Sequence, residues 1–241
     1  MAQMAHAQRM VLGVVFDGDD TLWSTEQLYD DARSRARDVV AQAGLNPATW
    51  EDCERRLDVQ NVHKLGYSMD RFPTSCVQAY EELCRSTGSS VNARIADRVR
   101  HAARSVFEHD PPLVLGARET LTFLRGRGVK LALLTKGDHE LQSRRIERSG
   151  LVDMFDVTQI VPEKSAAIIR AVVAALGVDT GSAWMVGNSI RSDVLPAIDA
   201  GIRAVWIPAH VWEYERAADK LVGDRVITAS HLADIPALIA A

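Results

Sequence analysis

The sequence predicts an α/β fold, a Rossmann-like parallel sheet with helices on both faces, joined to an all-helical cap. Three observations predict it. Apolar runs suited to buried strands occupy residues 11–16, 129–134 and 183–186, and polar residues follow each run directly. After Pro112, helical patterns alternate with strand patterns, as in parallel sheets. Between residues 24 and 112 the strand pattern is absent and apolar residues recur at helical spacing.

The first expected strand, residues 11–16, is apolar at five of six positions, including β-branched and aromatic types, which suits a strand buried on both faces. An acidic loop, Asp17-Gly18-Asp19-Asp20-Thr21, follows at once. Three carboxylates crowded at the end of a strand repel one another and lose solvation. Such a cluster is costly unless a cation or catalysis uses it, although an ordinary acidic turn is the alternative interpretation.

The next segment, residues 24–112, is expected to fold as a helical cap of about 89 residues. Its apolar spacing and its Gly and Pro positions predict four helices: one over 28–43, one from Pro47 to about Lys64, one from Pro73 to near Gly88, and one around 95–106. The segment leaves directly after the acidic loop, so it is expected to cover the strand ends as a lid does. Residues 11–23 and 113–241 would then form the core domain.

The remaining elements alternate in the core domain. Helices are expected over 117–125, 139–149, 164–176 and 194–200, and strands over 129–135, 155–161, 183–187, 203–207 and, weakly, 225–227. Polar loops follow these strands at Thr135-Lys136-Gly137, at Lys164 and at Asn188 to Asp193. Because the C-terminal ends of parallel strands meet at one crevice, we expect these loops and the acidic loop to build a single site.

These ordered motifs resemble the haloacid dehalogenase-like superfamily, which consists mostly of phosphatases. The matching stretches are FDGDDTLW (16–23), LLTKGD (133–138), Lys164 and VGNSIRSD (186–193). The resemblance spans roughly residues 11 to 208, and four motifs in order are far more specific than any one. It implies phosphomonoester hydrolysis, with a helical cap between the first two motifs.

Phosphoryl transfer needs an oxygen nucleophile, a proton donor for the leaving group, and positive charge around the transferred oxygens. Asp17 is expected to be the nucleophile and to form an aspartyl-phosphate. Asp19 is expected to protonate the leaving oxygen and then to activate water. Thr135 offers a hydroxyl and a backbone N–H, and Lys164 offers a positive charge. Taken alone, these two would be a strand-end Thr and a solvated surface Lys.

The expected cofactor is Mg²⁺, because the motifs offer hard oxygens and no His or Cys. The resemblance implies that the ligands are the Asp17 carboxylate, the Asp19 backbone carbonyl and an acidic residue of the fourth motif. The chain departs from the usual pattern there, because Asn188 stands where Asp is common. Its amide oxygen can bind a hard cation without adding charge, and Asp193 would compensate directly or through water. We therefore expect a weakened affinity for Mg²⁺.

The substrate is expected to be a small phosphorylated molecule, because a cap of this size excludes a folded macromolecule. Lys136 faces either substrate or solvent. Polar residues around the loop between the second and third cap helices would bind an anionic or hydroxylated substrate. The alternative interpretation of these residues is a solvated helix end. The expected substrate-binding residues are Thr135, Lys136, Gly137, Asn61, His63, Lys64, Tyr67 and Arg71.

Composition limits the remaining functions. The formal net charge of −4 gives no electrostatic reason to expect nucleic acid or an acidic membrane as a partner, and no apolar stretch approaches the ~18–20 residues that span a bilayer. Three irregularly spaced cysteines argue against disulfides and favour the cytoplasm. Either a monomer or a homodimer fits. A 2-haloacid dehalogenase, a phosphomutase and a non-catalytic binding protein are the alternative functions, although a halide leaving group would not need Asp19.

Overall fold

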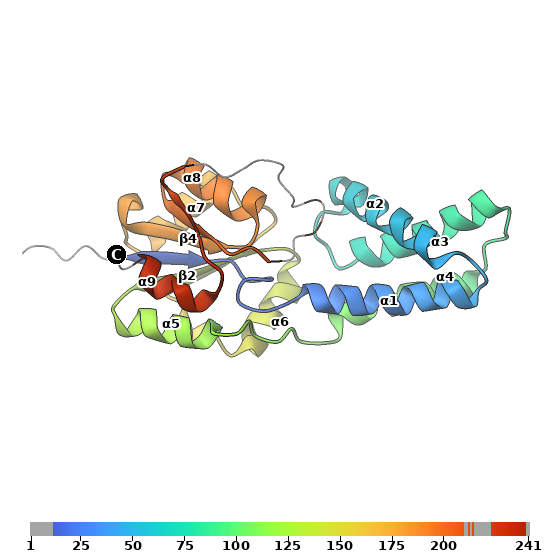
Figure 1. The fold of residues 1–241 in the computed structure, drawn as a ribbon, viewed down its shortest axis with the longest axis horizontal. Coiled ribbons are helices and arrows are strands. Elements are labelled where there is room, and N and C mark those ends of the chain that lie inside the picture. Colours follow the sequence, from blue (N-terminus) through green and yellow to red (C-terminus); the bar gives the residue numbers. More distant parts are fainter. Residues whose placement is uncertain (1–11, 210–211, 213, 215–222, 240–241) are drawn as a thin grey trace, which may run out of the picture.

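The computed structural model of the chain describes residues 12–209, 212, 214 and 223–239. Two parts lie side by side along the long axis of the molecule (Figure 1). One is a sheet covered by helices, and the other is a group of helices, α1 to α4, formed by residues 24–112 and called the helical segment. The N-terminal stretch Met1 to Met10, whose sequence predicts a short disordered lead-in, lies outside the described residues.

The sheet confirms the predicted α/β class. Its strands run in the order β3-β2-β1-β4-β5-β6, and every described pair is parallel. Phe16 lies opposite both Leu133 and Val186, so β1 is central and its end is level with those of its neighbours. The strands are β1 (Gly13–Phe16), β2 (Lys130–Lys136), β3 (Val157–Val161), β4 (Ala183–Gly187), β5 (Arg203–Trp206) and β6 (Val226–Thr228).

The central strands β1, β2 and β4 are buried on both faces, because their side chains alternate between two apolar clusters. On one face Val14 and Phe16 pack with residues of α5 (Ala117–Gly126) and α9 (Ile235–Ile239). On the other face Val15 packs with residues of α7 (Ala166–Ala175) and α8 (Leu195–Ala200). The apolar runs in the sequence are therefore strands that lie between two helical layers.

The helical segment has an apolar core of its own, formed by α1 (Glu26–Gln42), α2 (Pro47–Leu65), α3 (Arg71–Thr87) and α4 (Ala93–Arg104). Cys76, Tyr80 and Cys84, spaced four residues apart on α3, are buried in it as their helical spacing predicts. Trp50 is fully buried in this core, and its indole N–H donates to the Cys76 carbonyl at 3.1 Å. The three cysteines are free thiols.

The chain enters and leaves the helical segment at the same point. Trp23 and Leu113 form an antiparallel bridge. The Ser24 N–H donates to the Pro112 carbonyl, and the Val114 N–H donates to the Leu22 carbonyl, both at 2.9 Å. Helix α6 (His139–Ser149) of the other part also reaches the segment, because its Leu141 packs into the segment's apolar core.

Several boundaries differ from the sequence-based expectations. Helix α3 begins at Arg71 rather than after Pro73, since a proline is tolerated in the first turn, where its missing N–H is not needed. The Ser165 side chain caps α7, so Lys164 lies in the loop before the helix. A π-helical turn, Ile190–Val194, precedes α8, and β3 begins two residues later than expected. Helix α9 was not predicted.

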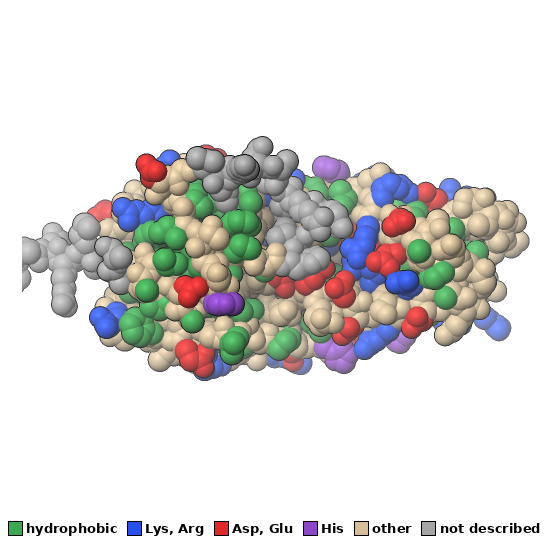
Figure 2. Space-filling view, in the orientation of Figure 1, with side chains coloured by type: hydrophobic (Ala, Val, Ile, Leu, Met, Phe, Trp, Pro, Cys, Tyr) green, Lys and Arg blue, Asp and Glu red, His purple; other side chains and the backbone are tan. Residues whose placement is uncertain are grey.

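The surface carries charges of both signs. On the face shown in Figure 2, Lys and Arg side chains are interspersed with Asp and Glu side chains over the helical segment. Within the described ranges, no helix combines the length and the apolar character that crossing a membrane requires.

Helix α5 allows a direct test of the packing on the sheet. Leu121 is fully buried in the cluster that includes Phe16, whereas Phe123, on the same helix, is 46% exposed. We expect Leu121→Ala to lower the free energy of unfolding by about 2–5 kcal/mol, because it removes buried methyl groups and leaves a cavity. Phe123→Ala should change it by less than about 1 kcal/mol. Urea unfolding of both variants measures the difference, and equal losses would contradict this assignment of the core.

Candidate active site

The acidic loop after β1 separates its carboxylates. The Asp17 N–H donates to the Val186 carbonyl at 2.9 Å and so continues the contact between β1 and β4. Gly18 is needed next, because a Cβ there would lie 2.5 Å from the ring of Trp23. Asp20 has a positive φ of 58° and accepts hydrogen bonds from the N–H groups of Thr25 and Glu26, at 2.8 and 3.0 Å. Asp20 therefore stabilises the start of α1.

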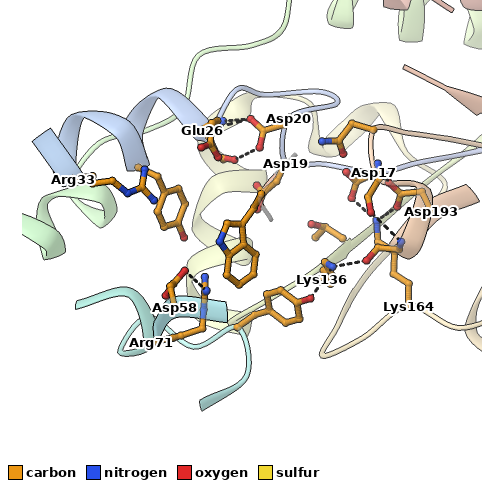
Figure 3. A pocket seen from close by; sticks show the side chains of 18 residues that line it. Asp17, Asp19, Asp20, Glu26, Arg33, Asp58, Arg71, Lys136, Lys164 and Asp193 are labelled. Atoms are coloured by element: carbon orange, nitrogen blue, oxygen red, sulfur yellow. Dashed lines mark hydrogen bonds and ion pairs between the residues drawn. The ribbon is translucent and has the colours of Figure 1, made fainter. Parts of the chain in front are cut away.

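Asp17, Lys164 and Asp193 form a buried ionic cluster at the ends of three strands (Figure 3). The Lys164 ammonium donates to Oδ1 of Asp17 and, at 2.6 Å, to Oδ1 of Asp193. The second oxygen of Asp193 accepts from the Ser189 N–H at 2.9 Å. Two carboxylates thus share one ammonium, which leaves the buried cluster with a net charge of −1.

The pKa values in this cluster reflect burial and the crowding of charge. Burial, and after it the charge of Asp193, raise the pKa of Asp17 from 3.8 to about 7 against the opposing charge of Lys164. Burial alone favours the neutral amine of Lys164, but the charges of Asp17 and Asp193 outweigh it and raise the pKa of Lys164. The lysine therefore stays cationic, and a further cation beside Asp17 would offset the crowding of negative charge that raises the pKa of Asp17.

Hard oxygen atoms converge beside the cluster. The Thr21 hydroxyl donates to Oδ2 of Asp17 at 3.2 Å and lies 3.5 Å from Oδ1 of Asn188. Asn188 is buried, and its backbone carbonyl accepts a hydrogen bond from the indole N–H of Trp206 at 2.9 Å. Among the described residues there is no group of three or more His, Cys, Asp and Glu side chains that could hold a metal. The oxygens available are two carboxylates, one amide and backbone carbonyls, a set that suits Mg²⁺.

Asp19 is held by groups different from those around Asp17. Its carboxylate accepts from the indole N–H of Trp23 at 2.6 Å, from the amide of Gln142 at 2.8 Å and from the guanidinium of Arg145 at 3.0 Å. Gln142 and Arg145 both lie on α6. Two of the three carboxylates of the loop are therefore paired with different cations, Asp17 with Lys164 and Asp19 with Arg145.

The end of β2 contributes Thr135 and Lys136. Thr135 is buried beside Gly18, with its hydroxyl 3.2 Å from the position that a Cβ of Gly18 would take. The Lys136 ammonium donates to the Tyr67 hydroxyl at 3.0 Å and lies 4.4 Å from the centre of that ring, and it also donates to Ser192. Lys136 thus connects the sheet to the helical segment.

These groups line a cavity of about 140 Å³ between the two parts of the molecule. Figure 3 shows Asp17, Lys164 and Asp193 on one side and Arg33, Asp58 and Arg71 on the other. The sheet side contributes Asp17, Asp19, Asp20, Thr135, Lys136, Lys164, Asn188, Ser189, Ser192 and Asp193, and the other wall contributes Thr25, Glu26, Tyr29, Arg33, Asp58, Tyr67, Arg71 and Trp212.

The cationic groups of the helical wall are paired inside the segment. Arg33 donates to Glu54 at 2.8 Å, and Arg71 donates to Asp58. The guanidinium of Arg71 also lies 4.2 Å from the centre of the Trp212 ring, a cation–π contact. Burial raises the pKa of Glu54 to about 7 against the attraction of Arg33. The wall therefore presents guanidinium groups whose positions are fixed.

The structure brings most of the sequence-predicted residues together. Among the expected substrate-binding residues, Thr135, Lys136, Tyr67 and Arg71 line the cavity. Asn61 instead points into the helical segment, where its amide donates to Ser75 and Gln78, both at 2.9 Å. Lys64 is exposed at the end of α2. His63 and Gly137 line a separate depression next to Tyr67.

Sequence analysis missed other residues of the site. The sequence indicates only weakly that Tyr29 and Arg33 face the site. The one indication is that Arg33 lies close to Ala32 and Ala36, which are buried positions in the helical pattern of α1. The pairing of Arg145 with Asp19 joins residues 126 positions apart, and no spacing rule marks it.

Comparisons with known proteins find hydrolases and phosphatases that are similar to most of this chain. A family model of haloacid dehalogenase-like hydrolases matches residues 11–201. The pyrimidine 5′-nucleotidase YjjG of Escherichia coli is 36% identical over 213 residues, which cover 82% of this chain and 86% of that protein. The N-acylneuraminate-9-phosphatase of Homo sapiens is 30% identical over 212 residues, 82% of each chain. The crystal structure of a haloacid dehalogenase-like family hydrolase from Xanthomonas campestris is similar with a TM-score of 0.77, 25% identity, and coverage of 96% of this chain and 95% of that one.

Gly187 offers a test of how tightly Asp193 is held. A Cβ at Gly187 would lie 2.3 Å from Oδ2 of Asp193, so Gly187→Ala must push that carboxylate away from Lys164 and Ser189. We expect a loss of about 3 kcal/mol in the free energy of unfolding, since a buried ion pair is broken. Gly181→Ala is the control, because nothing lies within 4 Å of its Cβ position. Equal urea midpoints for the two variants would contradict the geometry of the cluster.

Proposed function

Since the chain belongs to the haloacid dehalogenase-like hydrolase family, we propose that it is a Mg²⁺-dependent phosphatase of small phosphomonoesters that works through an aspartyl-phosphate. The observation that carries this proposal is the buried cluster of Asp17, Lys164 and Asp193 at the edge of the sheet. It presents a carboxylate nucleophile beside a fixed positive charge inside a cavity of small volume. The relatives named above include two phosphatases of small molecules.

In the first step an oxygen of Asp17 attacks phosphorus, and the bond from phosphorus to the leaving oxygen breaks. Asp19 supplies the proton that the leaving oxygen takes. Lys164, together with Thr135 and Lys136 at the end of β2, stabilises the negative charge on the transferred oxygens. The product alcohol departs, and the phosphoryl group stays on Asp17.

In the second step water attacks the phosphorus of the aspartyl-phosphate. Asp19, now ionised, takes the proton from that water, and the bond between phosphorus and Asp17 breaks. Inorganic phosphate leaves and the Asp17 carboxylate is restored. The same two carboxylates thus serve both steps, so each needs surroundings of its own. Asp17 is paired with Lys164, and Asp19 is paired with Arg145.

The residues beside the cluster fit Mg²⁺. Asp17, Asn188 and the Asp19 backbone carbonyl would hold it, with Asp193 acting directly or through water, since these are hard oxygens next to a site of net negative charge. When bound, the ion neutralises charge on the phosphoryl oxygens and orients them.

We further propose that the helical segment is the cap of this active site. It supplies the wall opposite the cluster, and Tyr67 and Arg71 are its proposed contacts with the organic part of the substrate. A cavity of about 140 Å³ admits a small phosphorylated metabolite and excludes a folded macromolecule.

Two further chemistries use the same nucleophile. A 2-haloacid dehalogenase would form an ester at Asp17 and release a halide, which needs no proton, and the firmly held Asp19 favours phosphate esters instead. A phosphomutase would return the phosphoryl group to a second hydroxyl. Release of inorganic phosphate, halide or an isomeric phosphate distinguishes the three reactions, and absence of all three would favour a non-catalytic binding protein.

Asp17→Asn tests the nucleophile. We expect release of phosphate from 4-nitrophenyl phosphate to fall by at least about a thousandfold, because an amide cannot form the covalent intermediate. Asp52→Asn, the same change at an exposed position of α2, is the matched control and should leave the rate unchanged. Chelation of the metal should abolish turnover of the wild type. Activity that survives Asp17→Asn would refute the aspartyl-phosphate route.

Asn188→Asp tests the metal site. The substitution adds a negative charge next to Asp17, so we expect the Mg²⁺ concentration for half-maximal activity to fall by about tenfold, since one charge at close range is worth more than about 1 kcal/mol. Titration of activity with Mg²⁺ measures it. An unchanged Mg²⁺ requirement would argue against Asn188 as a ligand.

A further inference from the structure

We propose that Gln142 and Arg145, two residues of α6 outside the cavity, are positioning residues that hold the Asp19 carboxylate for the step in which it takes a proton from water. The proposal rests on the proposed function, in which Asp19 is the general acid and base. The pair is called the α6 clamp below, and its members lie three residues apart and so on one face of the helix.

The clamp holds Asp19 from two directions. Arg145 Nη1 lies 3.1 and 3.0 Å from the two carboxylate oxygens, and Gln142 Nε2 lies 2.8 Å from Oδ2. Trp23 completes the set with its indole N–H, 2.6 Å from Oδ1. Every one of these contacts is a donation to a carboxylate oxygen, so three side chains fix the position and the orientation of the Asp19 carboxylate.

The clamp cannot act on a substrate directly. Asp19 lines the cavity, whereas neither Gln142 nor Arg145 does, and both are at least 96% buried behind it. Gln142 is itself anchored, since its amide also donates to the Lys136 carbonyl at 3.1 Å. Asp19 is the cavity-lining carboxylate to which both side chains donate, so it is their shared route to the reaction.

Burial of Arg145 is costly for stability and is explained by Asp19. Its Nε and Nη2 are buried and make no hydrogen bond to any described residue, and the same is true of Oε1 of Gln142. Unsatisfied buried polar groups destabilise a fold, and an apolar side chain of similar volume would serve packing better. The one ionic partner that the structure gives Arg145 is Asp19.

Two glycines make room for the donors. Gly137 has a φ of 138°, and a Cβ there would lie 3.2 Å from Gln142 Nε2. Gly18 lacks the Cβ that would clash with Trp23. Both glycines lie in the loops of the site, so the backbone there is shaped around the groups that hold Asp19.

The clamp makes a specific prediction for kinetics. An aryl phosphate with a good leaving group transfers its phosphoryl group to Asp17 with little need for a proton, whereas hydrolysis of the aspartyl-phosphate still needs the base. In Arg145→Met we therefore expect kcat for 4-nitrophenyl phosphate to fall about 10- to 100-fold, kcat/KM to change by less than about threefold, and a burst of one nitrophenolate per active site to appear. Gln142→Met should act in the same direction with a smaller effect.

Controls separate positioning from general stability. Arg148→Met removes an exposed arginine of the same helix, one paired with Asp110, and should leave all three quantities unchanged. Arg145→Lys should restore part of kcat. In an Asp19→Asn background, Arg145→Met should lower kcat less than about twofold further, because its target is already lost. A full additional loss in that background, or a wild-type kcat in Arg145→Met, would overturn the proposal.

A spectroscopic measurement tests the clamp without turnover. The indole N–H signal of Trp23 reports the position of Asp19, because it donates to that carboxylate. We expect Arg145→Met to shift this signal and Arg148→Met to leave it in place. If the wild type releases no phosphate, the proposed function fails by itself, and an unmoved Trp23 signal in Arg145→Met would separately overturn the clamp.

Discussion

The rest of the site depends on one arrangement, the sharing of the buried Lys164 ammonium by Asp17 and Asp193. Charges buried in this way are stable only when hydrogen bonds and opposite charges surround them closely. The topology meets that requirement, because the end of β1 lies between the ends of β2 and β4 and the loop after β3 carries the lysine. Gly187 adds the space that Asp193 occupies. The parallel sheet thus works as a frame that fixes three charges.

The acidic loop resolves its own repulsion by giving each carboxylate a different partner. Asp17 pairs with Lys164, Asp19 with Arg145, and Asp20 with the first N–H groups of α1. Neighbours in the sequence thereby acquire unlike surroundings. Asp17 is buried beside Lys164, Asp19 is held by donors from α6, and Asp20 lies at a helix start. Separate surroundings are what two carboxylates need if one is to attack phosphorus while the other moves protons.

Local sequence patterns predicted the strands and the residues at their ends, whereas side-chain directions depend on tertiary contacts. Apolar runs indicated the strands, and the polar residues after them indicated Asp17, Thr135, Lys164 and Asn188, because the ends of parallel strands must meet. The inward direction of Asn61 and the cavity-facing position of Arg33 depend on how α1, α2 and α3 pack together. The π-helical turn at 190–194 carries Asp193, which contacts Lys164, and the sequence of that turn does not predict its geometry.

The bridge between Trp23 and Leu113 means that the sheet's own chain path is nearly continuous across the helical segment. The polypeptide makes a long excursion and returns to the neighbouring position, as a hairpin does on a smaller scale. Exchange of the entire excursion for another of different length would therefore leave the strand order and the charged cluster in place. Such an architecture lets selection replace the proposed cap as a unit, while the charged cluster beneath it is inherited unchanged.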